Sequence, residues 1–285
     1  MISILTPTRG RPENVKRLVN SALSTAQFPG EVEFLFYVDL DDDSFPSEIE
    51  STNVKVIRGP RMWLSVLQNI LYANCKGEIV MYSGDDLVFK TQGWDKKVIS
   101  AIEKYPDKLV LVYPNDLGTY GESIAIHGFL HRNWINTVGH WVAPGRGSLY
   151  DLWHTEVARK LGRLHYLEDV HIAHIHYRQG EGLAAYDETY KYVSNATRSW
   201  KPMKTYKKLK RERRIDLVLL AEKIQGDSII HANYFLGEWL SRNKDRLGLK
   251  SLDSRRLKSL SNLEIVPLIF KNFFKFLFGL RRISD

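Results

Sequence analysis

Residues 78–86 read EIVMYSGDD, an apolar run followed at once by serine, glycine and two aspartates. The run Glu78–Tyr82 is short, rich in aliphatic residues and bounded by turn-forming residues, which is the pattern of a buried strand. Gly84 permits a tight turn and the close approach of a ligand, because it has no Cβ atom. The stretch therefore predicts a strand that delivers Asp85 and Asp86 to the edge of a sheet.

Strand and helix patterns alternate on both sides of this stretch. Short apolar runs predict further strands at Ile2–Leu5, Val32–Leu40, Val54–Ile57 and Leu109–Tyr113. Apolar residues at helical spacing predict helices at Asn14–Leu23 and Met62–Tyr72. This alternation is typical of an α/β fold in which helices cover both faces of a doubly wound, mostly parallel sheet.

Polar clusters follow three of the predicted strands. The segment TPTRGR, residues 6–11, follows the first strand, and an acidic cluster that begins at Asp39 follows the second. The pair Asp85 and Asp86 follows the strand quoted above. Ligands of doubly wound sheets bind outside the carboxyl ends of the strands. We therefore predict one site at this edge, where Asp39 accepts hydrogen bonds from a nucleobase or ribose and residues 41–43 form a solvated loop.

The chemistry of these side chains favours a cation beside a diphosphate. Mg²⁺ and Mn²⁺ prefer oxygen ligands and often take only one or two from protein. Glu168 or Asp169 could take the proton of an acceptor hydroxyl as a general base. His174 and His176 share one face of a predicted strand, His165–Tyr177, so one of them could complete the shell of the cation.

The second half of the chain changes in character. Residues 114–150 predict short strands and loops, and Asp151–Leu161 predicts a helix ended by Gly162. We place a boundary after residue 190, so that residues 1–190 form the α/β domain and residues 191–285 a helical extension. The extension has three predicted helices, at Thr205–Ile224, Ser228–Arg242 and Val266–Arg282.

Charge points to anionic partners. The 285 residues carry a net charge of +8, and the segment Lys201–Arg214 has eight basic residues against one acid, Glu212. Such a segment suits nucleic acid, lipid headgroups or phosphorylated substrates, or is a solvated helix face. Residues 266–285 combine phenylalanines with lysines and arginines, which suits an anionic membrane surface or packing on a second subunit of an oligomer.

Compartment signals are few. The single cysteine, Cys75, excludes an internal disulfide. The chain shows no charged leader before a long apolar stretch and no run of about 18 apolar residues. We expect a cytoplasmic protein that is peripheral on the inner face of the membrane if residues 266–285 bind lipid.

These motifs, taken in order, resemble the GT-A glycosyltransferases. The resemblance is strongest to the large inverting family 2-type enzymes, in a bacterial and phage branch, and covers roughly residues 2–190. It rests on four elements: the segment from residue 6 to Pro12, the strand end at Asp39, the aspartate pair with Gly93-Trp94-Asp95 downstream, and residues 168–190. It implies a GT-A fold with a carboxy-terminal helical extension.

The resemblance also implies roles by position. The nucleoside pocket would be lined by Pro7, Thr8, Arg9, Asp39 and Arg61. Asp85 and Asp86 match the family's Asp-x-Asp element, although Gly84 stands where the family often has an acid. Asp86 would bind the metal with His174 or His176, and Asp85 the donor. Asp169 matches the catalytic base, with Glu168 as the alternative.

The expected reaction is transfer of a sugar from a nucleotide-sugar, UDP-linked by family analogy, to an acceptor hydroxyl with inversion and with Mn²⁺ or Mg²⁺. The acceptor would be a glycan in polysaccharide or lipopolysaccharide synthesis, lipid-linked, or a modified DNA base. Two rival classes are nucleotidyl transfer, which needs a glycine-rich loop after the first strand, and a non-catalytic protein that binds nucleic acid or membrane.

Overall fold

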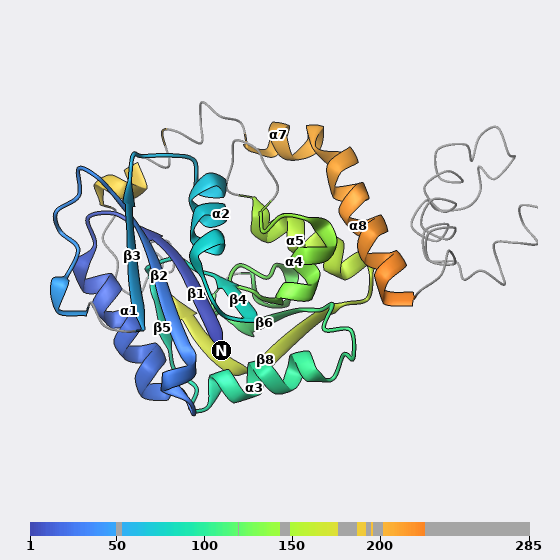
Figure 1. Cartoon of the computed structure of the whole chain (residues 1–285), viewed down its shortest axis with the longest axis horizontal. Helices are drawn as coiled ribbons and strands as arrows, with labels where there is room; N and C mark the ends of the chain where they lie inside the picture. The colour runs from blue at the N-terminus through green and yellow to red at the C-terminus, as the bar shows by residue number, and fades with distance from the viewer. Residues whose placement is uncertain are drawn as a thin grey trace, which may run out of the picture. The chain divides into compact units, whose positions relative to one another are not determined.

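The apolar runs that predicted strands lie side by side in one sheet (Figure 1). The structure is a computed structural model that describes residues 1–49, 53–118, 120–142, 149–175, 187–191, 195 and 202–225. Within these residues the sheet has eight strands in the order β3-β2-β1-β4-β7-β6-β8-β5. Their bounds are β1 Ile2–Thr8, β2 Val32–Asp39, β3 Val54–Gly59, β4 Ile79–Tyr82, β5 Leu87–Phe89, β6 Leu111–Asn115, β7 Phe129–His131 and β8 Leu164–His174.

Parallel pairing dominates the sheet, which confirms the predicted α/β class with a GT-A arrangement. β3, β2, β1 and β4 are parallel neighbours, and β6 pairs with β8 in parallel. β7 and β5 run antiparallel to their neighbours. β7 lies within residues 114–150, where short strands were predicted without bounds, and β5 was not predicted. Each is three residues long, which is too short to leave a periodic pattern in the sequence.

Helices cover both faces of the sheet. α1 (Pro12–Thr25) and α3 (Trp94–Glu103) lie along one side, while α2 (Leu64–Asn74), α4 (Arg132–Val138) and α5 (Tyr150–Lys160) lie along the other (Figure 1). Three short 3₁₀ turns complete the connections, at Pro29–Glu31, Ser47–Ile49 and Gly121–Ser123. The helices α3 and α4 were not predicted.

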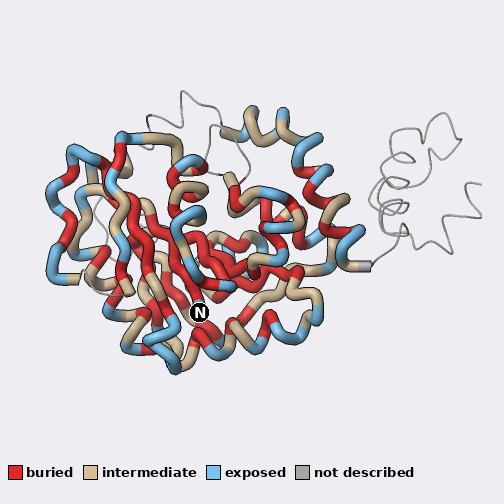
Figure 2. Tube along the Cα trace, in the orientation of Figure 1, coloured by how far each residue is buried: buried red, intermediate tan, exposed pale blue. Residues whose placement is uncertain are grey.

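Burial on both faces explains the continuous apolar runs of the central strands. Nearly every residue of β1, β2 and β4 is buried, as Figure 2 shows. Ile4 and Phe36 pack toward α1 and α3 in the main core, together with Trp94. Strands covered on both faces lose the alternation of polar and apolar residues that a half-exposed strand keeps.

The Gly93-Trp94-Asp95 element fixes α3 on α1. The buried Trp94 indole donates a hydrogen bond to the Ala22 carbonyl over 3.0 Å. The Asp95 carboxylate accepts the backbone N–H groups of Gln27 and Phe28 over 2.7 and 2.8 Å. The element therefore serves the core, because it holds the loop that follows α1 against the start of α3.

The first part of the extension packs on the α/β domain. Two helices, α7 (Pro202–Lys208) and α8 (Lys210–Gln225), replace the single helix predicted at Thr205–Ile224. The Asp216 carboxylate of α8 accepts a hydrogen bond from the Trp153 indole over 2.7 Å and lies 3.1 Å from His140 Nε2.

The chain divides into two compact units, Met1–Leu220 and Ala221–Asp285, so the first unit runs past the boundary predicted after residue 190. The two predicted helices after residue 225 lie outside the described residues. None of the described helices has the length and apolarity to cross a membrane.

Candidate active site

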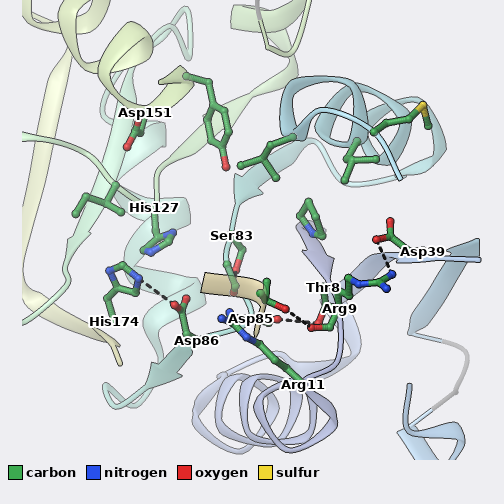
Figure 3. A pocket seen from close by; sticks show the side chains of 18 of the residues that line it. Thr8, Arg9, Arg11, Asp39, Ser83, Asp85, Asp86, His127, Asp151 and His174 are labelled. Atoms are coloured by element: carbon green, nitrogen blue, oxygen red, sulfur yellow. Dashed lines mark hydrogen bonds and ion pairs between the residues drawn. The ribbon is translucent and has the colours of Figure 1, made fainter. Parts of the chain in front are cut away.

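A cavity of about 320 Å³ opens at the carboxyl ends of β1, β2 and β4 (Figure 3). The structure brings most of the predicted site residues to this cavity. Those that line it are Pro7, Thr8, Arg9, Asp39, Arg61, Asp85, Asp86 and His174. They meet because parallel strands end at the same edge of the sheet, as predicted.

One end of the cavity has an acid between two cations. Asp39, the last residue of β2, is buried, and its carboxylate lies 2.9 Å from Arg9 Nη1. Arg61 Nε lies 3.7 Å from the same carboxylate. Arg9 is also paired with the exposed Asp41, so the loops after β1 and β2 are held together by charge.

Asp85 is a buried acid whose two oxygens are held by the chain itself. Its Oδ2 accepts a hydrogen bond from the Thr8 hydroxyl over 2.7 Å, and its Oδ1 lies 3.0 Å from Arg11 Nη1. Burial, and then the neighbouring charge of Asp86, raise the pKa of Asp85 to about 6, against the opposing effects of Arg11 and Thr8. Asp85 therefore ties the loop after β4 to the loop after β1.

Asp86 faces the cavity from the other side of the turn. Its Oδ2 accepts the Tyr190 hydroxyl over 2.7 Å and lies 3.3 Å from His174 Nε2. Burial alone would raise the pKa of Asp86, but the hydrogen bonds from His174 and Tyr190 lower it. Burial alone would lower the pKa of His174, but its bond to Asp86 raises it. The two groups thus form a charged pair inside the site.

Gly84 leaves room for this pair. A Cβ atom at position 84 would lie 2.6 Å from Asp86 Oδ1, so any larger residue there would require the Asp86 side chain to shift. The glycine therefore lets Asp86 keep its place beside the turn.

The donors in the site fit a divalent cation that has few protein ligands. Asp86 offers a carboxylate and His174 an imidazole, a mixed set that suits Mn²⁺. Among the described residues, no group of three or more His, Cys, Asp or Glu side chains is placed to hold an ion. Phosphate and water would supply the remaining ligands, which is common for Mg²⁺ and Mn²⁺. His176 lies outside the described residues.

The structure does not bring the predicted base, Asp169, to the cavity. On β8, His174 pairs with Leu87, and Asp169 lies five residues further back along the strand. Asp169 stands in an irregular part of β8, where Leu167 and His171 pair with consecutive residues of β6. The Asp169 side chain is 67% exposed and forms an ion pair with Lys97 of α3. Glu168 is exposed as well. Neither residue lines the cavity that the other predicted residues share.

A different carboxylate lines the cavity at its far end. Asp151 lies in the first turn of α5, beside Tyr150, and both residues line the cavity (Figure 3). Burial raises the pKa of Asp151 to about 6, although the Leu152 N–H donates to it over 2.8 Å. The sequence signal for Asp151 is weak, because an acid in the first turn of a helix ordinarily stabilises the helix end.

Residues 187–190 also join the site, although they are far in sequence from the loop after β1 that they contact. Arg11 makes two hydrogen bonds to Asp187, of 2.6 and 2.9 Å, and its guanidinium lies over the Tyr190 ring at 4.1 Å. The Thr189 hydroxyl donates to the Arg9 carbonyl over 3.1 Å. Residues 187–190 therefore lie across the loop after β1 and against Asp86. No spacing rule predicts a contact across more than 170 residues.

Known proteins resemble this chain in part of its sequence and in its fold. The sequence model of the family described as "Glycosyl transferase family 2" matches residues 3–128. A mannosyltransferase from Pyrobaculum calidifontis, PcManGT, in complex with GDP-Man and Mn²⁺, has a TM-score of 0.51 at 12% identity, over 96% of this chain and 87% of that one. No curated protein sequence matches the chain.

The S. aureus protein TarS has a similar fold. Its fragment 1–349 in complex with UDP has a TM-score of 0.52 at 15% identity, over 86% of this chain and 72% of that one. The chain spans 43% of the length of a longer TarS structure.

The chain has the GT-A fold of these glycosyltransferases, and residues 3–128 match the sequence model of glycosyl transferase family 2. The matched residues include the loops that carry Thr8, Asp39 and the aspartate pair. The match ends at residue 128, so Asp151 and His174 lie beyond it. The place of those two residues at the cavity comes from the structure alone.

Replacing Arg11 by methionine should destabilise the protein by about 3 kcal/mol, because the change leaves the buried Asp85 without its cation. The Arg11 and Asp85 side chains are only 10% and 5% exposed. Urea unfolding at pH 7 measures the change. The control is Lys97→Met, which breaks an exposed pair and should cost no more than about 1 kcal/mol. Equal losses for the two variants would contradict the assignment of Arg11.

Proposed function

We propose that the protein is a cation-assisted, inverting glycosyltransferase that uses a nucleoside diphosphate sugar. One observation carries the proposal: a single cavity is lined by Asp39 and Arg61, by the pair Asp86 and His174, and by Asp151. Figure 3 shows Asp39 on one side of the cavity and Asp86, His174 and Asp151 on the other. A nucleoside, a diphosphate and a sugar need these three kinds of environment.

The nucleoside end supports the choice of donor. Asp39 would accept hydrogen bonds from a ribose hydroxyl or a base N–H, because an ionised carboxylate only accepts. Arg9 and Arg61 would lie near the diphosphate charge. UDP is the first donor to test, because similar TarS structures contain UDP and UDP-GlcNAc, whereas the similar mannosyltransferase contains GDP-Man.

The middle of the cavity would hold the cation. When bound, a divalent cation neutralises the charge that develops on a departing diphosphate. Asp86 and His174 would hold it, and Asp85 would remain with Thr8 and Arg11. The Tyr190 hydroxyl, which now occupies Asp86 Oδ2, must give way to any ligand of that oxygen.

Asp151 would act as the general base. As the acceptor oxygen attacks the anomeric carbon, the Asp151 carboxylate takes the proton of the acceptor hydroxyl. The bond from the anomeric carbon to the diphosphate breaks on the opposite face, and its electron pair leaves with the nucleoside diphosphate. One displacement inverts the anomeric configuration.

Donor binding tests the proposal directly. With Mn²⁺ present, UDP should raise the melting temperature of the protein by several degrees, because a ligand that binds only the native state stabilises it. Chelation of the cation should remove most of the shift. UDP, GDP and UDP-sugars are compared in the same assay. If no nucleotide or nucleotide-sugar changes the melting temperature, the proposed function is wrong.

The base assignment predicts a pair of contrasting variants. Asp151→Asn should reduce transfer by at least about a hundredfold, since general bases contribute factors of 10² to 10⁴, and should leave the affinity for UDP unchanged. Asp169→Asn, which alters an exposed acid outside the cavity, should keep transfer within about twofold. Turnover by Asp151→Asn at the wild-type rate would reject the assignment.

The pH dependence follows from the same residue. A base works only when it is ionised, and the pKa of Asp151 is raised to about 6. Transfer by the wild-type protein should therefore fall as the pH drops through about 6 and level off above about 7. This limb should be absent from the residual activity of Asp151→Asn.

The acceptor proposal rests on the corner between α7 and α8. The exposed residues there include Lys207, Lys208 and Arg211, with Met203 and Ile215 also exposed. Basic side chains mixed with exposed apolar ones suit an anionic lipid surface, because the apolar side chains can enter the membrane interface while the basic ones meet the headgroups. We therefore propose a lipid-linked glycan acceptor, with a modified DNA base as the alternative.

Reversing charges at this corner tests the acceptor class. A triple variant, Lys204→Glu, Lys207→Glu and Lys208→Glu, should lose sedimentation with vesicles that contain phosphatidylglycerol. A control with the same change of charge at Lys76, Lys96 and Lys104 should retain it. Wild-type binding to duplex DNA but not to these vesicles would favour the DNA alternative.

A further inference from the structure

His127 has a buried ring nitrogen without a partner. The residue lines the cavity and is only 7% exposed. Its Nε2 atom is buried and makes no hydrogen bond to any described residue. Buried polar atoms in folded proteins are nearly always paired, so an exception needs an explanation. Of the side chains in the described part that have such an atom, only His127 lines the cavity.

The chemistry of an imidazole nitrogen fits a hydroxyl partner. A ring nitrogen of histidine either donates or accepts one hydrogen bond, depending on the tautomer. A hydroxyl can donate and accept, so it can pair with Nε2 in either tautomer.

The position of His127 identifies the part of the ligand that it can reach. Its ring meets His174 edge-on, with centroids 4.9 Å apart and an angle of 87°. Figure 3 shows His127 between Asp151 and the Asp86–His174 pair. The group that must lie between a bound diphosphate and the catalytic base is the transferred sugar, whose hydroxyls are hydrogen-bond donors.

We propose that His127 Nε2 forms a hydrogen bond with a hydroxyl of the transferred sugar and so helps to select the donor sugar. The inference rests on the proposed function. It assigns to His127 a role in specificity, separate from the roles of Asp86 and His174 at the cation and of Asp151 at the acceptor. A site that has a buried polar atom rejects a ligand without the matching hydroxyl, because that atom then stays unpaired.

Calorimetric binding in the presence of Mn²⁺ tests the proposal with UDP and with whichever of UDP-glucose, UDP-galactose and UDP-GlcNAc the wild type binds tightest. His127→Leu removes the ring nitrogen and should weaken binding of the UDP-sugar about tenfold, while the affinity for UDP alone stays unchanged. Tenfold corresponds to about 1.4 kcal/mol, the strength expected of one hydrogen bond. His127→Gln, whose amide oxygen can occupy the place of Nε2, should restore binding to within about threefold.

A matched control is available in the same fold. His154 is also buried and has an unpartnered Nε2, but it does not line the cavity. His154→Leu should lower the melting temperature as His127→Leu does, without changing the ratio of UDP-sugar to UDP affinity. This control separates loss of a buried imidazole from loss of a ligand contact.

Donors that lack one sugar hydroxyl complete a double-mutant cycle with His127→Leu. Removing the hydroxyl that contacts His127 should weaken binding of the UDP-sugar to the wild type about tenfold. The same removal should not weaken binding to His127→Leu any further. Equal weakening of UDP and UDP-sugar, together with weaker Mn²⁺ binding, would overturn the proposal in favour of a role at the cation. Unchanged UDP-sugar binding by His127→Leu would also overturn it. If the wild type binds no nucleotide at all, the proposed function fails instead.

Discussion

The parallel pairing of β1 with β4 is the constraint on which the site depends. Its register sets Leu5 opposite Tyr82, and the Ser83 N–H donates to the Leu5 carbonyl over 3.0 Å. The loops that follow the two strands therefore leave the sheet together. The bond between Thr8 and Asp85 follows directly from this register. A shift of one residue would turn the aspartates away from the cavity, because side chains alternate between the two faces of a strand.

Ion pairs and hydrogen bonds between buried side chains also hold the loops of the site together. Arg11 links Asp85 to Asp187, and His174 with Tyr190 encloses Asp86. Each carboxylate is thus placed by groups that come from other loops. A carboxylate placed in this way has its orientation set before a ligand arrives, which is what a preorganised site requires. The cavity also leaves two groups unused by this network, Asp151 and the Nε2 atom of His127. They are the groups assigned here to the acceptor and to the sugar.

The predicted base lies apart from its neighbour in the sequence, His174. Glu168 and Asp169 were predicted because they stand close in sequence to His174, which does line the cavity. The strand β8 is irregular where they lie, and neither of them lines the cavity. The first turn of α5 instead places an acid, Asp151, at the cavity. Closeness in sequence was therefore a poor guide, and the direction of each element was the deciding factor.

The sequence by itself determined the α/β class, the strands that carry Asp39 and the aspartate pair, and the edge at which their side chains meet. These features follow from local patterns: apolar runs for strands, helical spacing for α1 and α2, and glycine at the turn after β4. Only the tertiary structure decided that Asp151 lines the cavity while Asp169 does not. It alone brought residues 187–190 against Arg11 and left His127 Nε2 without a partner. Those features depend on pairing and packing between segments far apart in the chain, which no local pattern records.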